Sequence, residues 1–206
     1  MSLLSALAPY ARSTSRPAEH CELCAAPIPG EHPHVVELAS RRLCCACAAC
    51  GALFRDPAAG GGRYRTVPDR ILVDPAFAVA VERWEALSIP VRLAFVFRNG
   101  SLGRWVGIYP SPAGPTEVLL DGEPRALGES PLLELVEDDV EALLFFGRRG
   151  ALTLDCLLVP IDRCYELVGL VRRRYRGFDG EEGREAIERF VQELAARARP
   201  VERRPA

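Results

Sequence analysis

The chain has 206 residues, of which 49% are hydrophobic, and its formal net charge is -2 at pH 7. A chain of this length can bury one substantial core and carry a small metal-stabilised module beside it. The near-neutral charge argues against a general nucleic-acid binder and against a binder of acidic lipids, because both need a strongly positive surface.

Residues 1–18 come first, and we expect them to form a flexible tail. Their apolar start has no positively charged region before it, so it does not fit a secretory signal peptide. No later run approaches the roughly 18 apolar residues of a membrane-spanning helix. We therefore expect a cytoplasmic protein without membrane insertion, in which a reducing environment favours metal binding over disulfide formation.

Two C-x-x-C motifs follow, with 22 residues between them. Two cysteines three positions apart can turn both sulfurs toward one ion, and two such pairs complete a tetrahedron of thiolates. The motifs predict a four-cysteine Zn(II) site with these ligands: Cys21, Cys24, Cys47 and Cys50. Iron is the alternative, because rubredoxin-type sites use the same thiolates. Zinc is favoured because the sequence lacks the proline and aromatic packing usual around rubredoxin motifs.

The segment between the motifs predicts two short strands, over 34–38 and 41–45, joined by a turn. Such a hairpin brings the second motif beside the first, as in a zinc ribbon or a rubredoxin-like fold. Gly51 follows the second motif directly, where a positive φ is often required.

Cys44 and Cys45 are surplus to a site of four ligands. Adjacent residues of a strand point to opposite faces, so at most one of the two thiols can approach the metal. If the strand continues, Cys45 shares a face with Cys47, which makes Cys45 the possible substitute ligand.

The three histidines of the chain lie in the same segment: His20, His32 and His34. His32 and His34 would share a face of an extended segment. A second metal and a proton-linked contact are both open to them. Surface histidines that hydrogen-bond locally are the favoured interpretation.

The composition changes after residue 56, where a turn-rich, glycine-rich linker begins. We expect a metal-binding module over 19–56, an α+β domain over 57–199 and a flexible tail over 200–206. Residues 63–67 and 71–73 look extended. Asp74 and Pro75 fit the N-cap and first residue of a helix, whose apolar positions then follow helical spacing: Phe77, Val81, Trp84 and Leu87.

The rest of the domain predicts two apolar hairpins and two helices. The first hairpin pairs 90–97 with 102–109 across an Asn-Gly turn, and a rigid, proline-dense loop over 109–115 leads to a strand over 116–120. The second hairpin pairs 140–146 with 151–159, and helices begin near residues 161 and 181. The elements imply an antiparallel sheet of about five strands packed with helices.

No catalytic residue is assigned. The sequence holds no G-x-S-x-G motif, no H-E-x-x-H motif and no histidine outside 20–34. The acidic run over 137–141 fits a solvated turn, and helical spacing makes Cys164 a core residue more readily than a nucleophile. These observations favour a binding role over catalysis.

Four phrases resemble an uncharacterised, mainly actinobacterial family whose genes lie near those of [NiFe] uptake hydrogenases: GGRYRTVPDR, IPVRLAFVF, YPSPAGPTE and VPIDRCYELVGLVR. The resemblance spans most of the chain and implies an accessory role near hydrogenase biogenesis or electron transfer. It also implies matched residues beyond the four expected ligands: Cys45, His32, His34 and Cys164. Position 44 is usually apolar in that family, which makes Cys44 a spectator and Cys45 a more serious ligand candidate.

The favoured function is a zinc-binding accessory protein that docks with, or helps to mature, a [NiFe] hydrogenase. One alternative is a rubredoxin-like iron electron carrier that serves the same enzyme. A second alternative, ranked last because nucleic-acid binding does not suit the charge, is a zinc-ribbon nucleic-acid binder that uses four arginines: Arg41, Arg42, Arg63 and Arg65.

Overall fold

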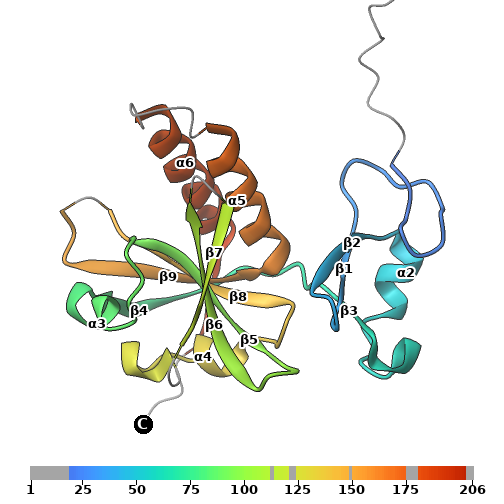
Figure 1. Cartoon of the computed structure of the whole chain (residues 1–206), viewed down its shortest axis with the longest axis horizontal. Helices are drawn as coiled ribbons and strands as arrows, with labels where there is room; N and C mark the ends of the chain where they lie inside the picture. The colour runs from blue at the N-terminus through green and yellow to red at the C-terminus, as the bar shows by residue number, and fades with distance from the viewer. Residues whose placement is uncertain (1–18, 112–113, 121–123, 149, 175–180, 203–206) are drawn as a thin grey trace, which may run out of the picture.

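The computed structural model describes residues 19–111, 114–120, 124–148, 150–174 and 181–202. The predicted tail over 1–18 lies outside these residues. The chain forms a three-stranded sheet followed by a seven-stranded sheet, and Figure 1 shows the smaller sheet standing beside the larger one. The architecture is the expected α+β type, but the sheets are larger than predicted.

The smaller sheet has the order β2-β1-β3. Strands β1 (His34–Glu37) and β2 (Arg42–Cys45) form the predicted antiparallel hairpin, in which His34 lies opposite Cys45. Strand β3 (Tyr64–Thr66) pairs with the other edge of β1, so this sheet extends beyond the predicted boundary at residue 56. The helix α2 (Ala48–Leu53) and the 3-10 helix η2 (Ala59–Gly62) connect β2 to β3.

The larger sheet has the order β10-β4-β9-β8-β5-β6-β7, and every neighbouring pair is antiparallel except β10 with β4. Its strands are β4 (Leu72–Ala80), β5 (Leu93–Asn99), β6 (Arg104–Ser111), β7 (Gly114–Leu119), β8 (Glu141–Phe146), β9 (Thr153–Pro160) and β10 (Arg199–Pro200). Its helical segments are α3 (Val81–Glu85), η3 (Pro124–Leu127), α4 (Leu132–Leu135), α5 (Ile161–Arg174) and α6 (Glu181–Arg197). The expected five strands are too few because β10 was not predicted and only the start of β4, within 71–73, was predicted as extended.

The helix predicted to begin at Asp74 is wrong, because this segment is strand β4 and only 81–85 is helical. The pairing of β4 with β9 shifts register between Val73 and Ala78, so the Asp-Pro pair forms an irregularity within a strand. The buried Asp74 carboxylate accepts hydrogen bonds from the Ala76 N–H at 3.2 Å and the Ser130 hydroxyl at 2.7 Å. Asp74, which was predicted to cap a helix, therefore stabilises a β-bulge instead.

Both predicted hairpins are present, as β5 with β6 and β8 with β9. The proline-dense segment is not the loop that was expected, because Pro110 pairs with Pro115 and Ser111 pairs with Gly114 across β6 and β7. Residues 112 and 113 lie outside the described part of the chain.

Helices α5 and α6 begin where they were predicted. Beyond residue 199 the Val201 N–H donates to the Val73 carbonyl at 2.8 Å, so the pairing with β4 continues past the predicted start of the tail.

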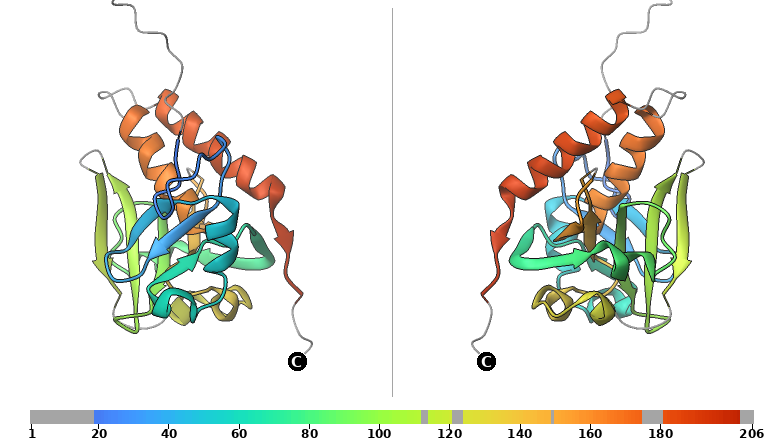
Figure 2. Two further views of the ribbon diagram at one scale, coloured as in Figure 1. Left: turned by 90° about the vertical axis from the view of Figure 1, so that its right-hand side faces the viewer. Right: turned by 90° about the vertical axis from the view of Figure 1, so that its left-hand side faces the viewer.

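Each face of the large sheet carries its own core. Helices α5 and α6 cover one face and α3, η3 and α4 cover the other, and Figure 2 shows β10 directly after α6 at one margin of the molecule. Trp84 and Cys164 are both buried core residues, as predicted. Burial raises the pKa of the Cys164 thiol well above its usual range, so this thiol does not supply a thiolate nucleophile at neutral pH.

The small module is packed onto the large domain rather than held only by a linker. Val35 points into the core of the module, while its neighbour Val36 joins the core beneath α5 and α6. Leu43 and Val67 join that same core. The alternation of β1 therefore divides its apolar side chains between two cores and fixes the module against the domain.

The acidic run over 137–141 is only in part the solvated turn that was expected, because 138–140 form a turn and Glu137 is exposed, but Asp139 and Glu141 are buried. The Glu141 side chain is fully buried, and its carboxylate accepts two hydrogen bonds from the Arg70 guanidinium at 2.6 and 2.7 Å. Asp139 has a φ of 66° and accepts from the Gly100 N–H. Burial raises the pKa of Asp139, although that hydrogen bond opposes the effect. The run is therefore structural, because it anchors β8 to the segment between the two sheets.

Replacing Arg70 by alanine tests this anchor. Arg70→Ala leaves the Glu141 carboxylate buried without its cation, so we expect the free energy of unfolding to fall by about 3 kcal/mol. Arg98→Ala is the control, because Arg98 forms an exposed ion pair with Asp138 and its loss should cost less than about 1 kcal/mol. Urea unfolding of both variants measures the difference, and equal losses would contradict the buried role of Arg70.

Candidate metal centre

The first C-x-x-C motif forms a tight turn. The Cys21 N–H donates to the Ala26 carbonyl at 2.7 Å, and the Ala25 N–H donates to the Cys21 carbonyl at 2.8 Å. Ala25, directly after Cys24, has a φ of 62°, which is the left-handed conformation. The turn buries Cys21 and leaves Cys24 exposed while bringing both thiols to the same side.

The second motif opens a helix instead of a turn. Cys47 is the N-cap of α2, and its Sγ accepts a hydrogen bond from the Cys50 N–H at 3.4 Å. Gly51 does not have the positive φ that was expected. An added Cβ at Gly51 would lie 2.8 Å from Pro33 Cβ, so this glycine instead allows α2 to approach the loop before β1.

The two motifs bring four sulfur atoms together. The Sγ atoms of the four predicted ligands all lie within 4.8 Å of one another: Cys21, Cys24, Cys47 and Cys50. The Cys24 and Cys47 sulfurs are 3.6 Å apart. A tetrahedral zinc with Zn–S bonds of about 2.3 Å places its sulfur ligands roughly 3.8 Å apart. The four cysteines therefore fit a metal ion, as the spacing predicted, and the thiolate set suits either zinc or iron.

The backbone around the cluster stabilises thiolates at two of the four positions. Burial raises the pKa of Cys21, but hydrogen bonds from backbone N–H groups, chiefly that of Cys47, outweigh burial and lower the pKa to about 6. The Cys50 N–H lowers the pKa of Cys47. Burial, together with hydrogen bonds to neighbouring sulfurs, raises the pKa of Cys50 to about 12. Four thiolates at this separation need a cation between them, which is what a divalent metal supplies.

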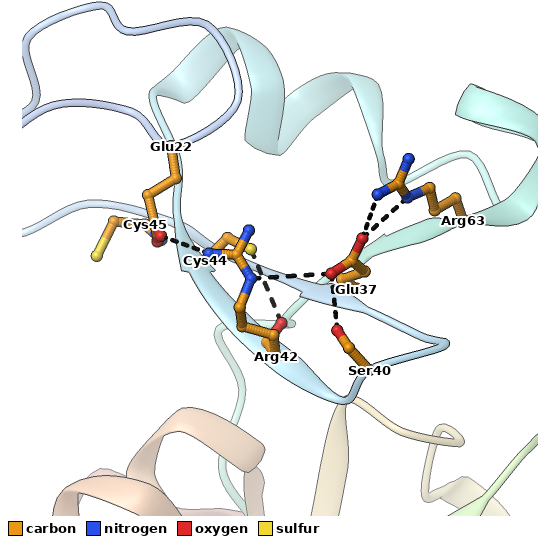
Figure 3. Close-up of polar contacts among 7 residues, drawn as sticks. All are labelled: Glu22, Glu37, Ser40, Arg42, Cys44, Cys45 and Arg63. Carbon is orange, nitrogen blue, oxygen red and sulfur yellow. Dashed lines mark hydrogen bonds and ion pairs between the residues drawn. The ribbon is translucent and has the colours of Figure 1, made fainter.

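Glu22, inside the first motif, ties that motif to β2. Its backbone N–H donates to the Cys45 carbonyl at 2.9 Å, and its carboxylate accepts from the Cys45 N–H at 2.6 Å and from Arg42 at 2.8 Å. Figure 3 shows the carboxylate lying over the end of β2. The sequence did not indicate this contact, because it depends on how the two motifs face each other.

A second carboxylate, Glu37, joins the strands of the module. It accepts hydrogen bonds from the Arg63 guanidinium and from the Ser40 hydroxyl at 2.7 Å, and it also pairs with Arg42 (Figure 3). The hydrogen bond from Ser40 and the Arg63 guanidinium lower the pKa of Glu37. This network connects β1, β2 and the start of β3 on the face that carries the charged side chains.

Cys45 does not join the four sulfurs as a substitute ligand would. Strand β2 ends at Cys45 and Cys47 already caps α2, so the two residues do not share a strand face. Cys44 and Cys45 point to opposite sides of β2 (Figure 3). The Cys44 thiol is buried 3.8 Å from the Arg42 carbonyl, and Cys45 lies instead in a second cluster with His32 and His34.

Among the described residues, His20 belongs to neither cluster of metal-binding side chains. It is exposed and forms an isolated β-bridge with Pro27.

A groove of about 1380 Å³ separates the module from the domain. One wall comes from the module and includes His32, Pro33 and Arg55, while α5 contributes Asp162 and Arg163 to the other wall. The groove is therefore lined by residues of both the four-cysteine module and the α+β domain.

A protein-family model described as "Family of unknown function (DUF5947)" matches residues 20–198, so the chain belongs to that family. No curated protein and no solved structure matches the chain. Within the described residues, no helix is both long enough and apolar enough to cross a bilayer.

Removing the metal should unfold the module. Zinc binding contributes on the order of 10 kcal/mol to the folding of small zinc modules. An ion bound to the four cysteines would join the turn of the first motif to the start of α2. We expect chelation to abolish hydrogen-exchange protection over 21–54, and we expect Cys21→Ser and Cys47→Ser each to lose the ion of this site.

Cys156→Ser is the control for these variants, because Cys156 is buried in the sheet core away from the cluster. It should retain the metal, as measured by elemental analysis. Unchanged exchange over 21–54 after chelation would show that the metal does not hold the module.

Proposed function

We propose that this member of the DUF5947 family is a zinc-binding accessory protein whose metal-held module forms one wall of a docking groove. The observation that supports this proposal most directly is the composition of the groove. Its walls come from the module and from α5 and the segments next to it. A structural metal in the module would therefore control the shape of a surface that two parts of the chain share.

The contacts of α2 support this role for a metal. Cys47 caps α2 and Cys50 lies on it, Gly51 packs against Pro33 of the groove wall, and the Thr66 hydroxyl donates to the Gly51 carbonyl at 2.6 Å. The metal would thus fix α2, and α2 would fix the loop before β1. Without the metal, the core of the module itself contains only a few buried apolar side chains.

Zinc is the ion that the site favours at equilibrium. A tetrahedral set of four thiolates binds both Fe(II) and Zn(II), but Zn(II) stands above Fe(II) in the order of affinities for such sites. Four protein ligands also leave no open position, which is typical of structural zinc.

The partner we propose is a protein, either a subunit of a [NiFe] hydrogenase or one of its maturation factors, in the cytoplasm. The resemblance of the four sequence phrases supports the choice of hydrogenase. The groove favours a partner with a polar surface, because its lining carries charges of both signs: Arg55, Arg70 and Arg163 together with Glu137 and Glu166. Complementary charges of both signs set the orientation of a protein partner.

A rubredoxin-like electron carrier is the second candidate, and the exposure of Cys24 favours it. A metal ligand at the surface would give electrons a short path to a partner. This function requires bound iron, a red colour and a reversible redox couple. Colourless protein with stoichiometric zinc would exclude it.

Nucleic-acid binding receives less support from the structure. All four arginines that were considered for it bond to acceptors of the protein: Arg41 to Glu117, Arg42 to Glu22, Arg63 to Glu37 and Arg65 to the Asp138 carbonyl. These contacts neutralise much of the positive charge that phosphate binding would use.

Binding of the zinc-loaded protein to purified [NiFe] hydrogenase and to its purified maturation factors tests the proposal. We expect one of these proteins to bind. Arg55→Glu, in the module wall of the groove, should weaken that binding at least tenfold, which is about 1.4 kcal/mol. Arg104→Glu is the control with the same charge change, because Arg104 is exposed on β6 outside the groove.

Calorimetric titration gives the dissociation constants. Metal-depleted protein should not bind. Equal losses for the two arginine variants, or no binding to any of these proteins, would contradict the proposal.

A further inference from the structure

A second cluster of metal-binding side chains lies beside the four cysteines. His32 precedes β1, His34 begins β1, and Cys45 ends β2 directly opposite His34. A ring nitrogen of each histidine and the Cys45 sulfur all lie within 4.8 Å of one another. The two imidazole rings have centroids 5.0 Å apart. The hairpin register therefore places two imidazoles and one thiol around a common point.

The hydrogen bond of His32 leaves one nitrogen for a metal. Its Nδ1 lies 2.8 Å from the Pro29 carbonyl oxygen, which can only accept, so Nδ1 carries the proton. The Nε2 of the neutral ring then holds a lone pair. This atom is buried and has no hydrogen-bond partner among the described residues, and the His32 side chain is only 6% exposed. A buried polar atom without a partner is costly to the folded state, and a metal ion bound to Nε2 would remove that cost.

The contact of His34 has the form seen at zinc sites. Its Nδ1 lies 2.9 Å from Asp162 Oδ2, in the first turn of α5. A carboxylate that holds one imidazole nitrogen orients the ring and makes the other nitrogen a better metal ligand. The second oxygen of that carboxylate, Asp162 Oδ1, is also buried without a partner within the described chain.

We propose that His32, His34 and Cys45 bind a second divalent metal ion, with Zn(II) as the expected ion. The ligand atoms would be the two Nε2 atoms and the Cys45 Sγ. Imidazole and thiolate together suit Zn(II), whose tetrahedral ligands lie roughly 3–4 Å apart. One thiolate and the Asp162 carboxylate balance the charge of the ion. The local hydrogen bonds favoured from the sequence are present only at His32, which bonds to Pro29, because the bond of His34 reaches Asp162 in α5.

This second ion would differ from the first in its open coordination. Three protein ligands leave the fourth position of a tetrahedral ion free, as in catalytic and exchangeable zinc sites. His32, His34 and Asp162 all line the groove between the module and the domain. The free position is therefore reachable by water, by a small ligand or by a donor side chain of a partner. The site rests on these contacts and does not depend on the proposed hydrogenase partner.

Metal titration of the full-length protein tests the site. Metal-free protein is titrated with Zn(II), and after desalting the bound zinc is measured by elemental analysis; Co(II) serves as the optical probe. We expect two ions per chain for the natural sequence, and one ion for Cys45→Ser and for His32→Gln. Cys44→Ser is the matched control, because the neighbouring thiol faces the other side of β2, and it should retain two ions.

Asp162→Asn provides a test outside the module. This residue positions His34 without touching the ion, so we expect two ions to bind but the affinity of the weaker one to fall by about 10- to 100-fold. The affinity of the four-cysteine ion should not change. A purely structural role of Asp162 would lower thermal stability without this selective loss.

One ion per chain in the natural sequence, or two ions in Cys45→Ser, would overturn the proposal. An equal loss in Cys44→Ser would do so as well, because it would show general damage to the module.

Discussion

Four cysteine sulfurs that converge on one point are the constraint on which the small module depends. The module has few buried apolar side chains of its own. Domains as small as this module rarely fold on such a core alone. The two motifs form different structures within the module. The first reverses the chain through Ala25 in a left-handed conformation, and the second starts α2 with Cys47 as its N-cap. One ion bound to all four sulfurs would hold the turn and the helix together.

The position of the module follows from the alternation of β1. Val35 faces the core of the module and Val36 faces the core of the domain, so the strand that carries His34 lies against α5. The contact between His34 and Asp162 joins residues 128 positions apart. The same packing creates the groove, since α2 and the loop before β1 face α5 across it. The packing of the module and the shape of the groove are therefore consequences of one arrangement.

Local patterns in the sequence predicted the parts of the fold that depend on local interactions. The spacing of the cysteine motifs identified the four thiols that the fold brings together, and alternating apolar residues identified both hairpins of the domain. The continuation of β4 past Val73 was missed because an Asp-Pro pair that fits a helix start also fits a bulge, and the contact with Ser130 stabilises the bulge. The predicted hairpin over 34–38 and 41–45 already sets His34 opposite Cys45, but the carboxylate of Asp162 comes from α5, and local sequence does not show that contact.

X-ray absorption spectroscopy at the metal edge tests the central claim most directly. The Cys45→Ser variant, purified without added metal, should leave only the four-cysteine site occupied. The account predicts a zinc edge and four sulfur neighbours at about 2.3 Å, with no nitrogen or oxygen in the first shell. A shell of nitrogen and oxygen ligands, or protein without stoichiometric metal, would show that the four sulfurs do not form the centre that holds the module.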